Sequence, residues 1–167
     1  MNHLTGSQIG RWKAMTSVPS RTAASCHPGV GVGVLLVDER GRVLLTLRKL
    51  APEAGCWSIV GGKLDYLETL QECAVREALE EVGLHVSIEV LLCVTDHLLP
   101  QENQHWVSPA YLGRVLKGEA KNCEPHKTSQ VSWFAIADLP ANLTMTARNA
   151  IAAYTSQFSQ SLNHRAR

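Results

Sequence analysis

Apolar and β-branched residues recur along the chain in short runs separated by glycine, proline and charged residues, a pattern that predicts several strands. The first run, residues 30–37, is followed by the turn sequence Asp38-Glu-Arg-Gly41 and by a second apolar run at residues 42–48. Two such runs joined by a short turn predict a β-hairpin. Further strands are expected at residues 56–60, leading into a turn at glycines 61–62, and at residues 86–94, 106–116 and 131–134.

Two segments show the spacing of amphipathic helices instead. Residues 68–82 are helix formers without proline, and they are followed by Gly83, a residue common at helix C-termini. The buried stripe of this helix is expected to consist of Val75, Ala78, Leu79 and Val82. The opposite side is expected to carry Glu77, Glu80 and Glu81. A final helix is expected after Asp138-Leu-Pro140, with one apolar face formed by Ala147, Ile151, Tyr154 and Phe158.

Strands on both sides of a central helix, followed by a closing helix, predict an α/β fold in which a mixed sheet is covered on both faces. A chain of 167 residues with 45% hydrophobic composition can bury one core and has no room for a second domain. Residues 1–28 are rich in Ser, Thr and Gly, which predicts an N-terminal tail. The predicted domain therefore comprises residues 29–159, followed by a C-terminal tail at residues 160–167.

Charge and cysteines restrict the setting in which the protein works. The formal net charge of +1 gives no general attraction to nucleic-acid polymers or to membranes, so anionic ligands must be recognised locally. The five cysteines contain no C-x-x-C pair, which argues against a zinc site or a disulfide framework and favours a reducing, cytoplasmic location. The sequence shows neither the apolar core of a signal peptide nor the roughly 20 apolar residues of a membrane span.

The most informative segment is residues 61–84, GGKLDYLETLQECAVREALEEVGL, which places acidic residues at helical spacing behind two glycines. Glu77, Glu80 and Glu81 repel one another when ionised, because residues three and four apart are neighbours on a helix. Arg76 relieves only part of this repulsion. A solvated acidic helix face is one interpretation. A site for a divalent cation such as Mg²⁺, which takes carboxylate and carbonyl oxygens as ligands, is the other.

This segment resembles the Nudix box of the Nudix hydrolases at Gly62, at Glu68 and along the run REALEEVGL at residues 76–84. The resemblance implies an α/β/α sandwich with a central mixed sheet, as in MutT-type Nudix domains, and Mg²⁺ as cofactor, with Mn²⁺ as a substitute. Three residues depart from the family pattern, namely Val60 in place of proline, Leu67 in place of glycine and the small Ala78. None of them removes a carboxylate, so the departures concern loop shape and helix packing rather than metal binding.

The resemblance also implies roles for individual residues of the box. In the family the last two glutamates and the glycine before the box bind metal, which here implies Gly61, Glu80 and Glu81. Glu77 is either a third metal ligand or the base that activates water. Glu68 and Arg76 are implied to pair and to hold the loop against the helix, and a plain stabilising ion pair is an equal interpretation.

Residues outside the box extend the candidate site. Glu124, in the segment NCEPHK, resembles a loop glutamate that reaches the metal in MutT-type members, and a solvated loop residue is the alternative. Arg48 ends an expected strand where the family often has a basic residue near substrate phosphate, and a surface arginine is the alternative. Trp106 is a candidate to stack on a nucleobase instead of packing in the core. The histidines are not spaced as zinc ligands and are interpreted as polar strand or loop residues, namely His97, His105 and His126.

The resemblance implies hydrolysis of the diphosphate linkage of a nucleoside diphosphate derivative, with a glutamate removing the proton of the attacking water. The loop that contains Glu124 favours a nucleoside triphosphate, cleaved to the monophosphate and pyrophosphate. Pro100, 16 residues beyond the box, matches a weak marker of ADP-ribose pyrophosphatases, the first alternative. A non-catalytic Nudix-fold module that senses a nucleotide is the second alternative, although such modules typically lose box glutamates. The oligomeric state stays open, with a homodimer as one option.

Overall fold

The computed structural model describes residues 27–162, with side chains as far as Phe158. The tail predicted at residues 1–28 lies almost wholly outside the described residues, and the tail predicted at residues 160–167 begins within the last helix. The described chain contains seven strands and four helical segments, which are α1 (Leu70–Val82), α2 (Met145–Leu162) and the 3₁₀ turns η1 (Pro100–Glu102) and η2 (Ile136–Asp138).

The strands form two sheets. The larger sheet has the order β4 (Val60–Lys63), β1 (Gly29–Leu36), β6 (Gln104–Lys117) and β5 (His85–Leu99). The smaller sheet has the order β3 (Trp57–Ser58), β2 (Arg42–Arg48) and β7 (Thr128–Ala135). Because β1 pairs in parallel with β6 and antiparallel with β4, the larger sheet is mixed.

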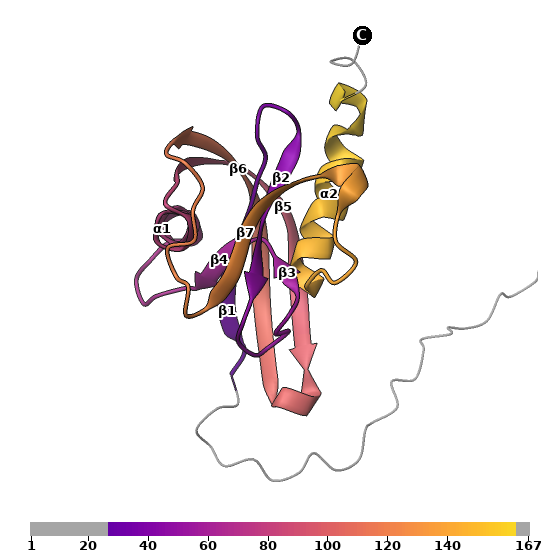
Figure 1. Ribbon diagram of the computed structural model, residues 1–167. Coiled ribbons are helices and arrows are strands. Elements are labelled where there is room, and N and C mark those ends of the chain that lie inside the picture. Colours follow the sequence, from indigo (N-terminus) through magenta and orange to yellow (C-terminus); the bar gives the residue numbers. More distant parts are fainter. Residues whose placement is uncertain (1–26, 163–167) are drawn as a thin grey trace, which may run out of the picture.

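The helices α1 and α2 lie on opposite sides of the strands (Figure 1). One core cluster joins α1 to the strands through residues such as Ala78 and Val34, and a second joins α2 to them through residues such as Ile151 and Leu35. Val34 and Leu35 are neighbours on β1 and therefore point to opposite faces, yet both are fully buried. This arrangement confirms the predicted α/β/α sandwich with a central mixed sheet.

The predicted hairpin of residues 30–37 and 42–48 is wrong, although its turn is present. The Asp38 N–H donates to the Arg42 carbonyl at 2.9 Å, which closes the turn. Beyond a single bridge between Val37 and Val43, β1 and β2 belong to different sheets. The end of β1 is buried on both faces, so it is most stable as a central strand, between β4 and β6. The second strand, β2, pairs with β3 and β7 instead.

The paired glycines do not form the predicted turn either. Gly61 and Gly62 lie within β4, opposite Gly33 and Val32 of β1. Gly61 has a φ of 155°, and a Cβ at this position would collide with the carbonyl oxygen of Val32. Glycine is required here because the backbones of β1 and β4 approach closely. The strand predicted at residues 56–60 is accordingly divided between β3 and β4.

Helix α1 begins at Leu70 and not at Glu68 because Thr69 caps it. The Thr69 side chain accepts a hydrogen bond from the Glu72 N–H at 3.2 Å, and the Glu72 carboxylate accepts one from the Thr69 N–H at 2.9 Å. This reciprocal capping box satisfies two backbone donors at the start of the helix. The predicted end at Gly83 is confirmed, because this residue adopts the left-handed conformation with a φ of 71°.

The buried face of α1 differs from the predicted apolar stripe. Val75 and Leu79 are 38% and 45% exposed. The helix buries Cys73, Ala74, Glu77, Ala78 and Val82 instead. Small side chains allow α1 to lie close to the glycines of β4, and a carboxylate is tolerated on this face because Arg76 pairs with Glu77 at 2.7 Å. Glu77 therefore faces the strands, where the prediction placed it on the opposite side.

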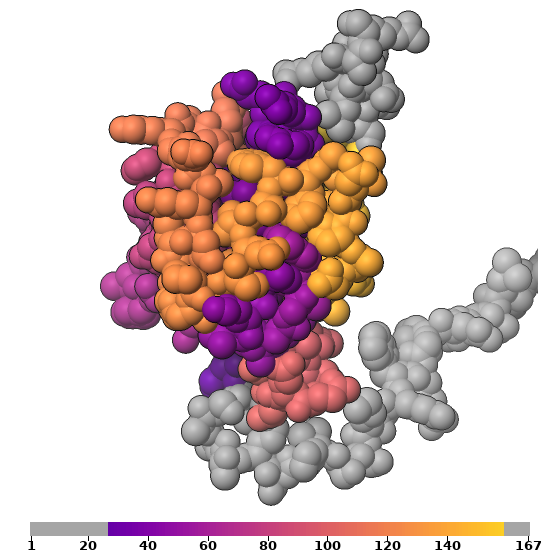
Figure 2. Space-filling view, viewed as in Figure 1, coloured from indigo at the N-terminus to yellow at the C-terminus, as the bar shows by residue number. Residues whose placement is uncertain are grey.

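The remaining elements agree better with the prediction. The β5–β6 hairpin is longer than the predicted segments, and its tip projects from the rest of the described chain (Figure 2). As predicted, α2 buries Ala147, Ile151 and Tyr154, and Phe158 packs against the same cluster. Neither helix in the described part of the chain is long and apolar enough to cross a membrane.

Candidate active site

The acidic helix packs directly on the two glycines of β4. The Gly61 N–H donates a hydrogen bond to Glu81 Oε2 at 3.1 Å. At Gly62, a Cβ would occupy the space that the Glu77 carboxylate fills. Two carboxylates of α1 are thus held against the backbone of β4, and only glycine leaves room for them.

Arg76 connects the loop before α1 to the acidic residues of the helix. Its guanidinium binds Glu68 in a bidentate manner, with Nε to Oε1 at 2.7 Å and Nη2 to Oε2 at 2.9 Å. These hydrogen bonds are the main cause that lowers the pKa of Glu68 to about 2. Nη1 also donates to Glu77 at 2.7 Å and to Glu80 at 3.0 Å. The predicted ion pair is present, and its role as support for the site stays a prediction.

Burial shifts the pKa of two of the three predicted acidic residues of α1. It raises the pKa of Glu81 to about 7, an effect that the Gly61 N–H opposes and that the charges of Glu77 and Glu124 reinforce. Burial also raises the pKa of Glu77, and Arg76 counteracts part of this effect. The Glu80 side chain, by contrast, is 53% exposed. Glu77 and Glu81 therefore form the buried part of the cluster.

Glu124 lies close enough to this pair to act electrostatically on Glu81. Its Oε1 accepts a hydrogen bond from Lys127 Nζ at 2.7 Å. Its Oε2 is buried and has no hydrogen-bond partner among the described residues. The loop is tied to α1, since the Cys123 N–H donates to the Glu81 carbonyl at 3.0 Å. This placement does not fit the alternative of a solvated loop residue.

The residues present fit a divalent cation. The unpartnered Oε2 of Glu124 is an oxygen donor beside two buried carboxylates, and hard cations such as Mg²⁺ prefer such donors. The raised pKa values of Glu77 and Glu81 also show that a positive charge would be favourable here. Across residues 27–162, no three acidic, histidine or cysteine side chains are already arranged as metal ligands.

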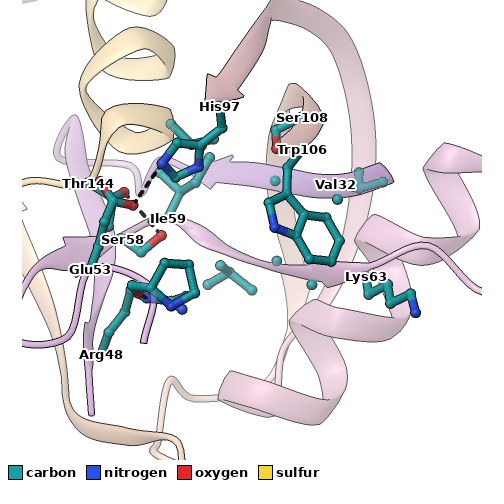
Figure 3. A pocket seen from close by; sticks show the side chains of 17 residues that line it. Val32, Arg48, Glu53, Ser58, Ile59, Lys63, His97, Trp106, Ser108 and Thr144 are labelled. Atoms are coloured by element: carbon teal, nitrogen blue, oxygen red, sulfur yellow. Dashed lines mark hydrogen bonds and ion pairs between the residues drawn. The ribbon is translucent and has the colours of Figure 1, made fainter. Parts of the chain in front are cut away.

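A cavity of about 200 Å³ borders the same two glycines. It is lined by both residues predicted to contact substrate, Arg48 and Trp106 (Figure 3). Arg48 Nε donates to the Pro52 carbonyl at 2.9 Å, and Trp106 Nε1 donates to Gln104 Oε1 at 2.9 Å. These hydrogen bonds fix both side chains, whose roles in substrate binding stay predictions.

Alternate glycines of β1 leave the floor of the cavity free of side chains. Gly29, Gly31 and Gly33 point to the same side of the strand. A Cβ on the first would collide with the ring of Trp106, and a Cβ on the third would collide with Ile59. Gly31 lies between them, with no heavy atom closer than 3.5 Å to its Cβ position. The strand thus provides a flat surface beside the indole.

The sequence did not predict that several polar residues line this cavity, among them Glu53, Ser58, His97 and Thr144. His97 was interpreted as a polar strand residue, but it is only 7% exposed and lies opposite Trp106 in the β5–β6 ladder. One signal was available, because Thr95 and His97 occupy alternate positions of a strand and both are buried. The sequence could not show that these positions face a cavity.

Comparisons with known proteins agree with this architecture. The family model of the NUDIX domain matches residues 27–154. An ADP-ribose pyrophosphatase of Methanocaldococcus jannaschii is 32% identical over 114 residues, which cover 68% of this chain and 66% of that protein. A putative 8-oxo-dGTP diphosphatase of Bacillus subtilis is 30% identical over 110 residues, which cover 66% of this chain and 68% of that protein. The chain therefore spans about two thirds of the length of these relatives.

A solved structure of a Nudix hydrolase is also similar to this chain. The crystal structure of a MutT NUDIX hydrolase from Burkholderia pseudomallei is 43% identical, has a TM-score of 0.70, and covers 76% of this chain and 98% of that chain. The sandwich, the acidic helix and the glycine strand define a Nudix domain, and this chain belongs to the Nudix hydrolase family. The expected class of enzyme, a hydrolase acting on diphosphate bonds, is confirmed by this membership.

Proposed function

We propose that the protein hydrolyses a nucleoside triphosphate to the monophosphate and pyrophosphate in a reaction that depends on Mg²⁺. The observation that supports this most directly is the position of Gly61 and Gly62, which border both the carboxylate cluster and the cavity. A nucleotide that spans these two features has its base in the cavity and its phosphates beside Glu77 and Glu81. The name of the Bacillus subtilis relative, a putative 8-oxo-dGTP diphosphatase, is consistent with such a substrate.

The metal is proposed to be held by Gly61, Glu77, Glu80 and Glu81, with Glu124 close by and with Mn²⁺ as a substitute for Mg²⁺. A bound divalent cation supplies positive charge that stabilises phosphate oxygens in the transition state. The chain itself offers little such charge at this position, because Arg76 is already engaged by three carboxylates and Lys127 by Glu124. Without a cation, the carboxylates would repel the phosphates that they are meant to receive.

We assign phosphate binding, base stacking and activation of water to side chains of the protein. Arg48 and Lys63 line the cavity and can neutralise phosphate oxygens. Trp106 is proposed to stack on the base. The water that attacks phosphorus needs a base, and Glu77 and Glu124 are the two candidates. We favour Glu77, because the helix fixes its position and the absence of a side chain at Gly62 leaves room for its carboxylate.

The proposed function is tested with a panel of nucleotides at increasing Mg²⁺ concentration. Turnover of a triphosphate to the monophosphate and pyrophosphate, abolished by a chelator and by Glu81→Gln, is the expected result. Chromatography separates this outcome from release of orthophosphate. Pyrophosphate release that persists without divalent metal would contradict the proposal.

ADP-ribose is the alternative substrate, and the same panel includes it. The alternative is supported by the Methanocaldococcus jannaschii relative, which is named an ADP-ribose pyrophosphatase, and by Pro100, which begins the η1 turn of the β5–β6 hairpin. A non-catalytic sensor is a second alternative, and the retention of every box glutamate argues against it. Nucleotide binding without turnover at any Mg²⁺ concentration is the result that would establish the sensor.

We also propose a cellular location and an oligomeric state for the protein. A cytoplasmic location agrees with the described cysteines, all of which are free thiols, namely Cys56, Cys73, Cys93 and Cys123. A homodimer is supported by the edge of β5, which pairs with no second strand among residues 27–162 and where Val94 and Leu98 are 55% and 56% exposed.

A further inference from the structure

Glu53 and His97 form a polar pair in the cavity, on the side away from Lys63 (Figure 3). Glu53 Oε2 lies 3.5 Å from His97 Nε2, which is longer than an N–H···O hydrogen bond of roughly 2.7–3.2 Å. In the described part of the chain, His97 Nε2 is buried and has no hydrogen-bond partner. Buried polar groups normally have a partner, so this nitrogen is available to bind a ligand in the cavity.

Glu53 is fixed in the orientation that creates this pair. Its Oε1 accepts a hydrogen bond at 3.0 Å from the N–H of Met145, the first residue of α2. Its backbone has a φ of 55°, a left-handed conformation that is uncommon for a residue other than glycine. The Glu53 carbonyl accepts from the Cys56 N–H at 3.1 Å, which holds the loop. The second carboxylate oxygen is therefore left facing the imidazole.

The surroundings of the pair match the shape of a nucleobase. His97 and Trp106 are directly opposite in the β5–β6 ladder, so their side chains project from the same face of the sheet. The indole forms one wall of the cavity, and the backbone at Gly31 leaves the floor open. A planar ring that stacks on Trp106 can direct its hydrogen-bonding edge towards Glu53 and His97. The volume of about 200 Å³ is below the roughly 300–1,000 Å³ that holds a drug-sized ligand, so the cavity is of a size for a single ring system such as a base.

We propose that Glu53 and His97 determine the base specificity of the site and select a guanine-type base. This inference rests on the proposed function and names the substrate class within it. An ionised carboxylate only accepts hydrogen bonds, and a neutral imidazole with its proton on Nε2 donates one. Guanine presents the N1–H and 2-amino donors beside the O6 acceptor, so Glu53 Oε2, the carboxylate oxygen that Met145 does not engage, can accept from both donors while O6 accepts from His97.

Adenine satisfies the pair less well. Its edge offers one donor, the 6-amino group, and one acceptor, N1, so the carboxylate gains a single hydrogen bond. Rejection of a ligand that leaves a buried polar group unpaired is a strong source of specificity. ADP-ribose, whose base is adenine, is therefore a poor substrate under this assignment.

The test compares kcat and KM for dGTP, dITP and dATP in the native protein and in variants of the pair. Glu53→Gln keeps a carbonyl oxygen for the Met145 N–H but directs an amide donor into the cavity. His97→Asn and His97→Gln form a matched pair, because the longer amide reaches the position of Nε2 and the shorter one does not. Thermal melting confirms that each variant is folded.

The native protein is expected to prefer dGTP over dATP by at least about 10-fold in kcat/KM, with dITP intermediate because it lacks the 2-amino group. Glu53→Gln and His97→Asn are expected to lower kcat/KM for dGTP about 10- to 100-fold through KM, while dATP changes by less than about 3-fold. His97→Gln is expected to retain more of the dGTP preference than His97→Asn. A merely structural role would change all three substrates alike.

A binding measurement separates this inference from the proposed function. Calorimetric titration with GMP, IMP and AMP, without metal, is expected to give the same order of affinity. Equal affinities of the native protein for GMP and AMP would overturn the role of the pair, as would a guanine preference that persists in both Glu53→Gln and His97→Asn. Neither result would affect the proposed hydrolase activity. If no triphosphate releases pyrophosphate but GMP binds more tightly than AMP, the proposed reaction fails and the base assignment holds.

Discussion

Glu81 is a buried carboxylate whose charge is only partly compensated by its hydrogen-bond partner. Its pKa is raised to about 7 by burial, and the Gly61 N–H supplies one partner where an ionised carboxylate can accept several. Such a residue is unfavourable for the metal-free fold at neutral pH and favourable for the binding of a divalent cation. Stability and function therefore respond in opposite directions when the charge is removed.

Replacement of Glu81 by Gln is expected to abolish most turnover and to raise the stability of the metal-free protein by about 1–3 kcal/mol above pH 7. The amide keeps an oxygen for the Gly61 N–H and removes a buried charge. Between the ordinary pKa of 4.5 and the native pKa of about 7, the folded protein holds one proton more than the unfolded chain. The native carboxyl therefore loses stability as pH rises through this window, and the gain from Gln should vanish below pH 4.5.

Urea unfolding in chelator at several pH values measures this effect. Glu39→Gln is a matched control, since Glu39 is an exposed turn residue. Near-normal turnover of Glu81→Gln in saturating Mg²⁺ would remove Glu81 from the ligand set, and a stability gain independent of pH would contradict the assigned cause.

The identity of the water-activating base is a second question about individual side chains. Glu77→Gln is expected to lower the maximal rate about 10²- to 10⁴-fold, the usual contribution of a general base, with a smaller loss in Glu124→Gln. Mg²⁺ titrations distinguish the two roles, because loss of a metal ligand also raises the Mg²⁺ concentration required. A larger fall in maximal rate for Glu124→Gln, at unchanged metal requirement, would assign the base to the loop.

The contact between α1 and β4 shows which features of a helix can be predicted from the sequence and which cannot. The helix, its end at Gly83 and its acidic residues followed from local pattern, because capping and helical spacing involve neighbours in sequence. The buried face of the helix did not follow from local pattern. Val75 and Leu79 are more apolar than Ala74 and Glu77, yet Ala74 and Glu77 are buried, because the position of β4 determines which side of the helix is covered. The false hairpin of β1 and β2 has the same cause, since strand pairing is a long-range property.

The residues that line the cavity were harder to predict from the sequence than the contact between α1 and β4. Arg48 was predicted by resemblance and Trp106 as an aromatic residue after a polar loop. Glu53 and His97, by contrast, are 44 positions apart by their numbers and meet only because β5 and the loop after β2 both approach α2. Nothing in the spacing of these two residues distinguishes them from surface residues. Their function becomes visible only through burial and a missing hydrogen-bond partner.

Gly62→Ala tests the dependence of the site on the glycine strand. A methyl group at this position would meet the Glu77 carboxylate, so the side chain must move and its 2.7 Å contact with Arg76 is strained. The expected outcome is a loss of stability of about 1–3 kcal/mol together with loss of turnover. Gly31→Ala is the control for stability, because its Cβ would make only ordinary contacts at 3.5 Å. Equal melting temperatures for the two variants would show that α1 can withdraw from β4 without cost.

Association of two copies is the first prediction that concerns the assembled protein. The edge strand β5 exposes Val90, Leu91, Val94 and Leu98 between 41% and 56%. An unpaired apolar edge favours pairing with a second strand, and charges on such an edge oppose it. Light scattering is expected to give a dimer for the native chain and a monomer for the double variant Val94→Lys and Leu98→Lys. A native monomer at all accessible concentrations would disprove the homodimer.

Removal of residues 1–26 is expected to leave turnover unchanged. The composition of this segment offers no periodic apolar face, the match to the NUDIX domain begins at residue 27, and the first strand of the fold begins at Gly29. The part of the candidate site that the structure describes is formed by β1, β4, β5, β6, α1, the loops that carry Glu53 and Glu124, and the start of α2. The shortened chain is compared with the full chain for kcat, KM and melting temperature at equal protein concentration. A fall in kcat/KM without a change in melting temperature would show that the segment contributes to substrate binding, and a fall in both would place it in the fold.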